Sequence, residues 1–162
     1  MGRRANRFAI NHVGETIEKR INETFERAKK QAIGSQEQSD YAKYLCILVS
    51  GYLEKSITSK LMQYCSSKSN NRVSRFAESK LKRMTNMKYE KILELLKSFD
   101  PSWGDAFEEK IDDKKRDQIN SLVGLRNAVS HGGDNSITLK NIEDIFDTIK
   151  DVVNDFYNST NN

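Results

Sequence analysis

The stretch YAKYLCILVSGYLEKSITSKL, residues 41–61, decides the fold class. Its apolar residues fall at spacings that cover nearly every face of a helix, which predicts a helix buried on most sides. Residues 44–49 alone could form a buried strand, but the helical pattern continues without interruption beyond them and argues against that interpretation. Ser39 or Asp40 can cap this helix, and we expect it to reach about Ser66 and to lie at the centre of the molecule.

Further helices are predicted on both sides of this stretch. Before it, apolar residues recur every three or four positions from about residue 7 to residue 32. After it, similar patterns cover about residues 72–84 and 86–99, where Asn86 can cap the second of these helices and Pro101 stops it. Residues 103–111 form an ambiguous connector. Two more helices are expected over about residues 113–131 and, from a Thr138 cap, to about residue 156.

The composition favours the same fold class. Hydrophobic residues make up 36% and charged residues 31% of the 162 residues, and there is a single proline. This balance suits amphipathic helices and leaves few breakers for a many-stranded fold. We therefore predict an all-α fold, an up-and-down bundle of five to seven helices, with residues 1–162 forming one domain.

The same composition excludes several classes of site and location. No stretch approaches the roughly 20 apolar residues of a membrane span, and the first ten residues lack the apolar core of a signal peptide. We therefore expect a cytoplasmic protein without membrane contact. The two histidines lie far apart and there is no Cys-x-x-Cys pair, so no zinc site is visible. We expect no cofactor and a metal-independent mechanism.

Charge is distributed unevenly along the chain. Residues 1–90 carry 18 Lys and Arg against 9 Asp and Glu, a net charge of +9, whereas residues 91–162 carry 9 against 14, a net charge of −5. A basic half attracts polyanions, although charge runs are often only solvated helix faces. The helix over residues 72–84 is the most cationic, with basic side chains opposite an expected apolar face of Val73, Phe76, Ala77, Leu81 and Met84.

Residues 122–132, LVGLRNAVSHG, carry the most informative motif. In it Arg126 is followed directly by Asn127 and, five positions on, by His131 and two glycines. This segment resembles the HEPN superfamily, whose members are described by a late helix with Arg, four to six residues, then His. The glycines and the last amphipathic helix are similar to the RiboL-PSP type. The resemblance implies a helical bundle that dimerises, with two such motifs at one interface that cleave RNA without metal.

The spacing within the motif is compatible with a composite site. Two residues five apart on a regular helix point about 140° from each other and are separated by a rise of about 7.5 Å. Arg126 and His131 are therefore too divergent to grip one phosphate from one face. A local distortion, a frayed helix end or a second subunit is required, and the dimer implied by the resemblance meets that need.

The resemblance also suggests roles for individual side chains. His131 is the candidate acid or base, because histidine titrates near neutral pH and can move the proton of a 2′-OH. Arg126 can stabilise charge on the phosphate, and Asn127 can orient either group. We expect both Arg126 and His131 to lie at a helix end, outside the apolar stripe. Glu54 is the candidate for a further acidic residue on an earlier helix, unless it is only an exposed i,i+4 partner.

Phosphate binding by the basic helix fits the same function. The residues that we expect to bind RNA there are Arg72, Arg75, Lys80, Lys82 and Arg83.

Alternative interpretations remain open for the motif and for the function. Structurally, Arg126 could pair with Asp134 while His131 merely caps its helix. Functionally, the leading hypothesis is an endoribonuclease used as a toxin or defence effector, with an antitoxin or regulatory partner. The alternative is a catalytically silent HEPN dimer that acts as an RNA- or nucleotide-binding regulatory module. A helical DNA-binding or scaffolding protein is a third class, for which no recognition-helix signature is present.

Overall fold

The structure, a computed structural model, describes residues 5–133 and 136–161, with side chains from residue 15 onward. Within these residues the chain forms seven α-helices and no strand, which confirms the predicted all-α bundle of five to seven helices. The helices are α1 (Ala5–Lys29), α2 (Gln36–Lys68), α3 (Asn71–Leu81), α4 (Tyr89–Phe99), α5 (Pro101–Lys110), α6 (Asp113–Ser130) and α7 (Leu139–Ser159).

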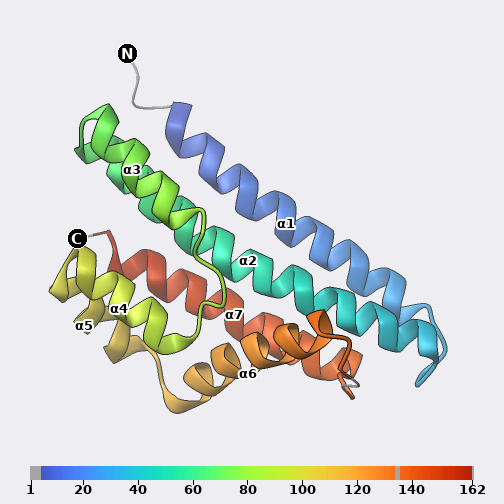
Figure 1. The fold of residues 1–162 in the computed structure, drawn as a ribbon. Coiled ribbons are helices and arrows are strands. Elements are labelled where there is room, and N and C mark those ends of the chain that lie inside the picture. The colour runs from blue at the N-terminus through green and yellow to red at the C-terminus, as the bar shows by residue number, and fades with distance from the viewer. Residues whose placement is uncertain (1–4, 134–135, 162) are drawn as a thin grey trace.

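Helix α2 lies at the centre of the bundle, as its sequence predicts. Helices α1, α3, α6 and α7 all contact it, and α1, α3 and α6 run opposite to α2 and α7 (Figure 1). Leu45, Cys46, Val49 and Ile57 of α2 are fully buried in one continuous apolar core. None of the described helices combines the length and the apolar character needed to cross a membrane.

The helix starts differ from the sequence-based expectation at two places. The cap of α2 is Ser35, whose hydroxyl accepts a hydrogen bond from the Gln38 backbone N–H at 3.1 Å, so the helix begins before the predicted Ser39 or Asp40. Helix α4 begins after Lys88, so the predicted Asn86 cap is wrong. Asn86 has a positive φ of 55°, in the left-handed region that asparagine tolerates better than most residues.

The ambiguous connector is a helix. Pro101 ends α4 as predicted, but it also occupies the first turn of α5, where its missing N–H costs no hydrogen bond. Asp100 caps α5 by accepting from the Ser102 N–H at 2.9 Å. Trp103 and Phe107 of this helix are buried in the core. The Asp100-Pro101 pair therefore marks both the end of α4 and the start of α5, and the sequence-based expectation covers only the first of these.

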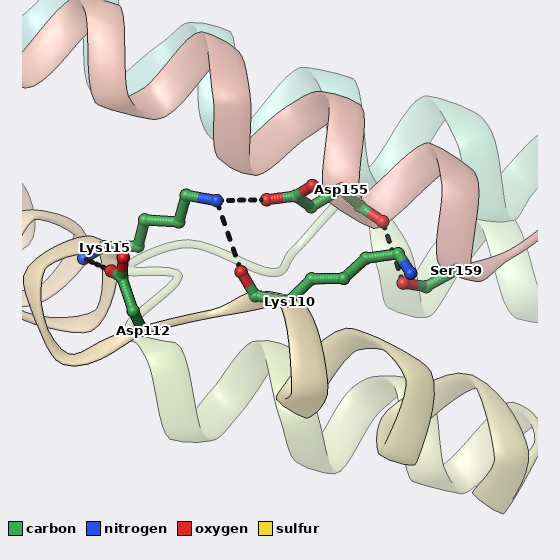
Figure 2. A network of polar contacts seen from close by, with 5 residues as sticks. All are labelled: Lys110, Asp112, Lys115, Asp155 and Ser159. Atoms are coloured by element: carbon green, nitrogen blue, oxygen red, sulfur yellow. Dashed lines mark hydrogen bonds and ion pairs between the residues drawn. The ribbon is translucent and has the colours of Figure 1, made fainter.

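A network of hydrogen bonds connects α5, α6 and α7 (Figure 2). The Lys115 ammonium donates to a carboxylate oxygen of Asp155 on α7 at 2.8 Å and to the Lys110 carbonyl at the end of α5 at 3.2 Å. The Lys115 backbone N–H donates to Asp112, the cap of α6, at 2.8 Å. The hydrogen bond to Asp155 raises the pKa of Lys115. This network fixes the start of the helix that carries the motif.

We expect Lys115→Met to lower the free energy of unfolding by about 1 kcal/mol, because the ion pair is only partly shielded from solvent. A raised lysine pKa stabilises the folded state fully below the ordinary value of 10.5, and this contribution is lost as the pH rises through the folded value. The difference between wild type and variant in urea titrations should therefore shrink above about pH 10.5. Lys114→Met, at the exposed neighbouring position, serves as the control and should change little.

Candidate active site

The motif lies at the carboxyl end of α6. His131 is the C-cap of this helix, and the next residue, Gly132, has a positive φ of 70°. The Gly132 N–H donates to the Val129 carbonyl at 3.1 Å and the Gly133 N–H to the Ala128 carbonyl at 2.9 Å. This pair of hydrogen bonds is a Schellman motif, which ends the helix at a defined residue. The glycines therefore fix the position of His131 relative to Arg126.

Two amide oxygens hold the Arg126 guanidinium. Its Nη1 donates to Asn127 Oδ1 at 3.2 Å and to Asn86 Oδ1 at 3.4 Å. Arg126 is half-buried and follows the buried Ile119 and Leu122 by seven and four residues. It therefore continues the apolar stripe of α6, so the expectation that it lies outside the stripe is wrong. Its hydrogen bonds to described residues involve one nitrogen, so within this part of the chain the other guanidinium N–H groups remain for a ligand.

Glu54 reaches the same network from α2, through Asn86. The Asn86 backbone N–H donates to Glu54 Oε1 at 2.7 Å, while the Asn86 side chain accepts from Arg126. The structure thus brings three of the predicted site residues, Glu54, Arg126 and Asn127, into one chain of contacts. Asn86 joins them, a role that was not predicted from the sequence. The sequence signal for a left-handed turn was an asparagine in a loop that has no glycine, because asparagine adopts the left-handed conformation more readily than most residues.

The buried thiol of Cys46 lies near this network. Burial raises the pKa of Cys46 to about 11, and the Arg126 charge opposes that rise only in part. The thiol is therefore protonated at neutral pH, and a protonated thiol is a poor nucleophile. Cys46 belongs to the core that supports Arg126.

His131 is exposed, and within the described residues its imidazole makes no hydrogen bond or ion pair. Its backbone N–H donates to the Asn127 carbonyl at 3.1 Å. The Ser130 hydroxyl donates to the Arg126 carbonyl at 2.9 Å, so it is hydrogen-bonded to the backbone of the last turn of α6. The structure does not bring His131 to the Glu54–Asn86–Arg126 network within one chain, in agreement with the divergence expected from helix geometry.

The alternative pairing of Arg126 with Asp134 falls on a residue outside the described part of the chain. Among the described residues, Arg126 forms no ion pair, and both of its hydrogen-bond partners are neutral amides. Its positive charge is therefore not neutralised by any carboxylate that the structure describes. Such a held but uncompensated guanidinium is suited to bind an anion.

The predicted RNA-binding residues Arg72, Arg75, Lys80, Lys82 and Arg83 are all exposed. Lys82 is paired with Glu78 at 2.6 Å, so this lysine is less available than the other four. The expected apolar face of α3 is only partly correct: Leu81 is buried, but Phe76 is 63% and Val73 51% exposed. Asn86, which contacts Arg126, lies in the loop between α3 and α4. This loop therefore connects the basic helix to the residue that holds Arg126.

Comparison with known proteins places these features in a family context. Residues 15–162 match the family model described as RiboL-PSP-HEPN. The match includes α2, the loop with Asn86, and the whole of α6 and α7. No curated protein and no solved structure matches the chain significantly.

Proposed function

The chain belongs to the RiboL-PSP-HEPN family, and from this membership we propose that it is a metal-independent endoribonuclease that acts as a toxin or defence effector. The HEPN superfamily includes ribonucleases, and HEPN domains commonly bind RNA and dimerise. The proposal places catalysis at Arg126 and His131, with Asn127 and Glu54 in supporting roles. It treats residues 1–162 as one domain in the cytoplasm, where an antitoxin or other regulatory partner would control it.

The observation that carries the proposal is the way in which Arg126 is held. Its guanidinium is half-buried at the end of α6, supported by two neutral amide oxygens and by no carboxylate among the described residues. A guanidinium oriented before substrate binds can stabilise charge that develops on a phosphate without first reorganising. Five residues on, His131 supplies an imidazole, a group that can donate or accept a proton in general acid–base catalysis.

These groups suit cleavage of RNA by its own 2′-OH. A base removes the 2′-OH proton, the 2′-oxygen forms a bond to the adjacent phosphorus, and the bond from phosphorus to the 5′-oxygen breaks. Arg126 stabilises the negative charge on the phosphate oxygens, and an acid protonates the departing 5′-oxygen. The products are a 2′,3′-cyclic phosphate and a 5′-OH end. His131 is the acid or base in this scheme.

A second copy of the chain would complete the site. Arg126 and His131 diverge within one chain, so a partner's motif is needed to place both groups on one phosphate. Helix α2 offers a surface for this beside the network: Ile47, Gly51 and Glu54 follow one another at helical spacing. Ile47 is 43% exposed, and an added Cβ at Gly51 would meet no atom within 4 Å. We propose that two copies meet over this face.

We expect light scattering to give the mass of two chains at micromolar concentration, and Ile47→Asp to shift it toward one chain, because a carboxylate would be buried in the interface. Ile33→Asp is the matched control, since Ile33 is 97% exposed in the turn between α1 and α2. A wild-type mass of one chain would contradict the dimer, and equal effects of the two substitutions would contradict this interface.

RNA incubated with the protein in EDTA tests the proposed function. Cleavage with 2′,3′-cyclic phosphate ends is the expected result. Products with 3′-OH ends would point to a metal-activated water and would overturn the mechanism. If the protein binds RNA but does not cut it, the silent regulatory module takes the place of the nuclease.

Neutralising four cations of α3 is expected to weaken RNA binding and to flatten its dependence on salt. Each lost phosphate contact with a single strand should reduce the slope of log K against log salt by about 0.7, so four should reduce it by about 3. The four residues are Arg72, Arg75, Lys80 and Arg83. A variant with the same net charge, changed at the exposed residues Lys19, Lys30, Lys110 and Lys114, is the control. Equal slopes for the two variants would remove the binding role of α3.

A further inference from the structure

Helix α3 has an aromatic side chain on its solvent face. The packed side of the helix is marked by the buried Leu81 and the half-buried Ala77. Arg72, Phe76 and Lys80 follow one another at intervals of four residues, so they form a row on a different side. Phe76 is 63% exposed, the most exposed aromatic side chain described. Its ring is therefore available in the middle of a cationic row.

The cations around this ring are available as well. Among the described residues, Arg72, Arg75, Lys80 and Arg83 form no ion pair, because the carboxylate on this helix, Glu78, is paired with Lys82 at 2.6 Å. The Lys80 ammonium lies over the Phe76 ring, 5.4 Å from its centroid. A ligand for this surface must be anionic and must also offer flat apolar groups.

A single-stranded polynucleotide has both properties. Its unpaired bases can stack on an aromatic ring while its phosphates contact neighbouring cations. A duplex offers phosphates alone, because its bases are already stacked inside the helix. We propose that α3 is a binding strip for single-stranded RNA, in which Phe76 stacks on a base and Arg72 and Lys80 bind the flanking phosphates.

The position of the strip fits a substrate path. Helix α3 runs beside α2, and the loop after it turns toward α4 and α6 (Figure 1). Asn86 in that loop contacts Arg126. The strip and the candidate active site are thus joined by one short segment of chain. This inference rests on the proposed function and narrows its substrate to RNA with unpaired bases.

Fluorescence anisotropy with a labelled 12-nucleotide RNA, alone and as a duplex with its complement, tests the strip. We expect Phe76→Ala to weaken single-strand binding by about tenfold and to leave duplex binding unchanged, since stacking of one base is lost. Phe76→Trp should keep the affinity. The salt slope should stay unchanged in Phe76→Ala, in contrast to the four-charge variant, because no phosphate contact is lost. Val73→Ala, which removes an exposed apolar side chain without a ring, is the matched control.

The outcomes separate this inference from the proposed function. If wild type cuts RNA but Phe76→Ala binds the single strand as tightly as wild type, or loses duplex binding equally, the strip is overturned and the nuclease stands. If Phe76→Ala instead changes the mass in light scattering, the ring belongs to an interface between copies and the strip is overturned. Stacking on Phe76 without any cleavage would support the strip and overturn the nuclease. Wild type that binds neither form of RNA overturns both.

Discussion

Arg126→Ala and His131→Ala are each expected to slow RNA cleavage by about 10² to 10⁴-fold. Loss of an acid or base group costs about 10² to 10⁴ in rate, and loss of a group that stabilises developing charge costs about 10² to 10³. A time course of RNA cleavage by each purified variant, at equal concentration, measures the effect. The two losses should be comparable in size and should not add in the double variant, because both groups act on one step.

The two positions need different controls for stability. His131 is exposed, so His131→Ala should change the free energy of unfolding by less than about 1 kcal/mol. Arg126 is half-buried in the stripe of α6, so Arg126→Met, which keeps an apolar stem, separates loss of charge from loss of packing. If wild type is active and all three variants keep its rate at equal melting temperature, catalysis does not occur at this motif.

Asn86→Gly is expected to lower the cleavage rate by up to about 10²-fold, because a small displacement of a catalytic group can cost that much. Glycine keeps the left-handed conformation and the N–H that donates to Glu54, so only the oxygen that accepts from Arg126 is removed. Asn86→Asp keeps that oxygen but pairs the guanidinium with a carboxylate, so it should restore the position of Arg126 without restoring the rate. The loss should appear in kcat more than in KM, and the guanidinium ¹⁵N signals of Arg126 should show faster exchange in the glycine variant.

Glu54 provides a second test of the same arrangement. Glu54→Gln keeps an oxygen that can accept the Asn86 N–H, so a role through Asn86 predicts that this variant stays active while Glu54→Ala does not. A direct acid or base role predicts that Glu54→Gln loses activity.

Wild-type rates in Asn86→Gly, with unchanged guanidinium signals, would show that Asn86 does not position Arg126.

Local patterns allowed much of the fold to be predicted from the sequence. The Thr138 cap of α7 is present, with its hydroxyl accepting from the Asn141 N–H at 3.1 Å, because a cap needs only residues three positions apart. The central place of α2 followed from apolar residues on all its faces. Phe76 was assigned to the packed side of α3, because spacing shows that a face is apolar but does not show whether another helix covers it.

The contacts of the candidate site are non-local, so the sequence can propose its members but cannot predict how they are connected. Arg126 and His131 were found from a motif within one helix. The link between Glu54 and Arg126 depends on Asn86, which lies 32 residues from one and 40 from the other. Local spacing gives Asn86 only the interpretation of a helix cap. Its role depends on the position of the loop between α3 and α4, which is set by the packing of α2 against α6.

The Schellman turn after α6 has a consequence for the length of the motif. Gly132 needs its positive φ, and a Cβ at Gly133 would come within 3.0 Å of the Ala128 carbonyl oxygen, so the turn fixes where the helix stops. Asn86 fixes the direction of Arg126 from the other side. One residue inserted between Arg126 and His131 would leave His131 at the turn but rotate Arg126 by about 100° away from Asn86. The interval between the two residues should therefore tolerate substitutions far better than insertions or deletions.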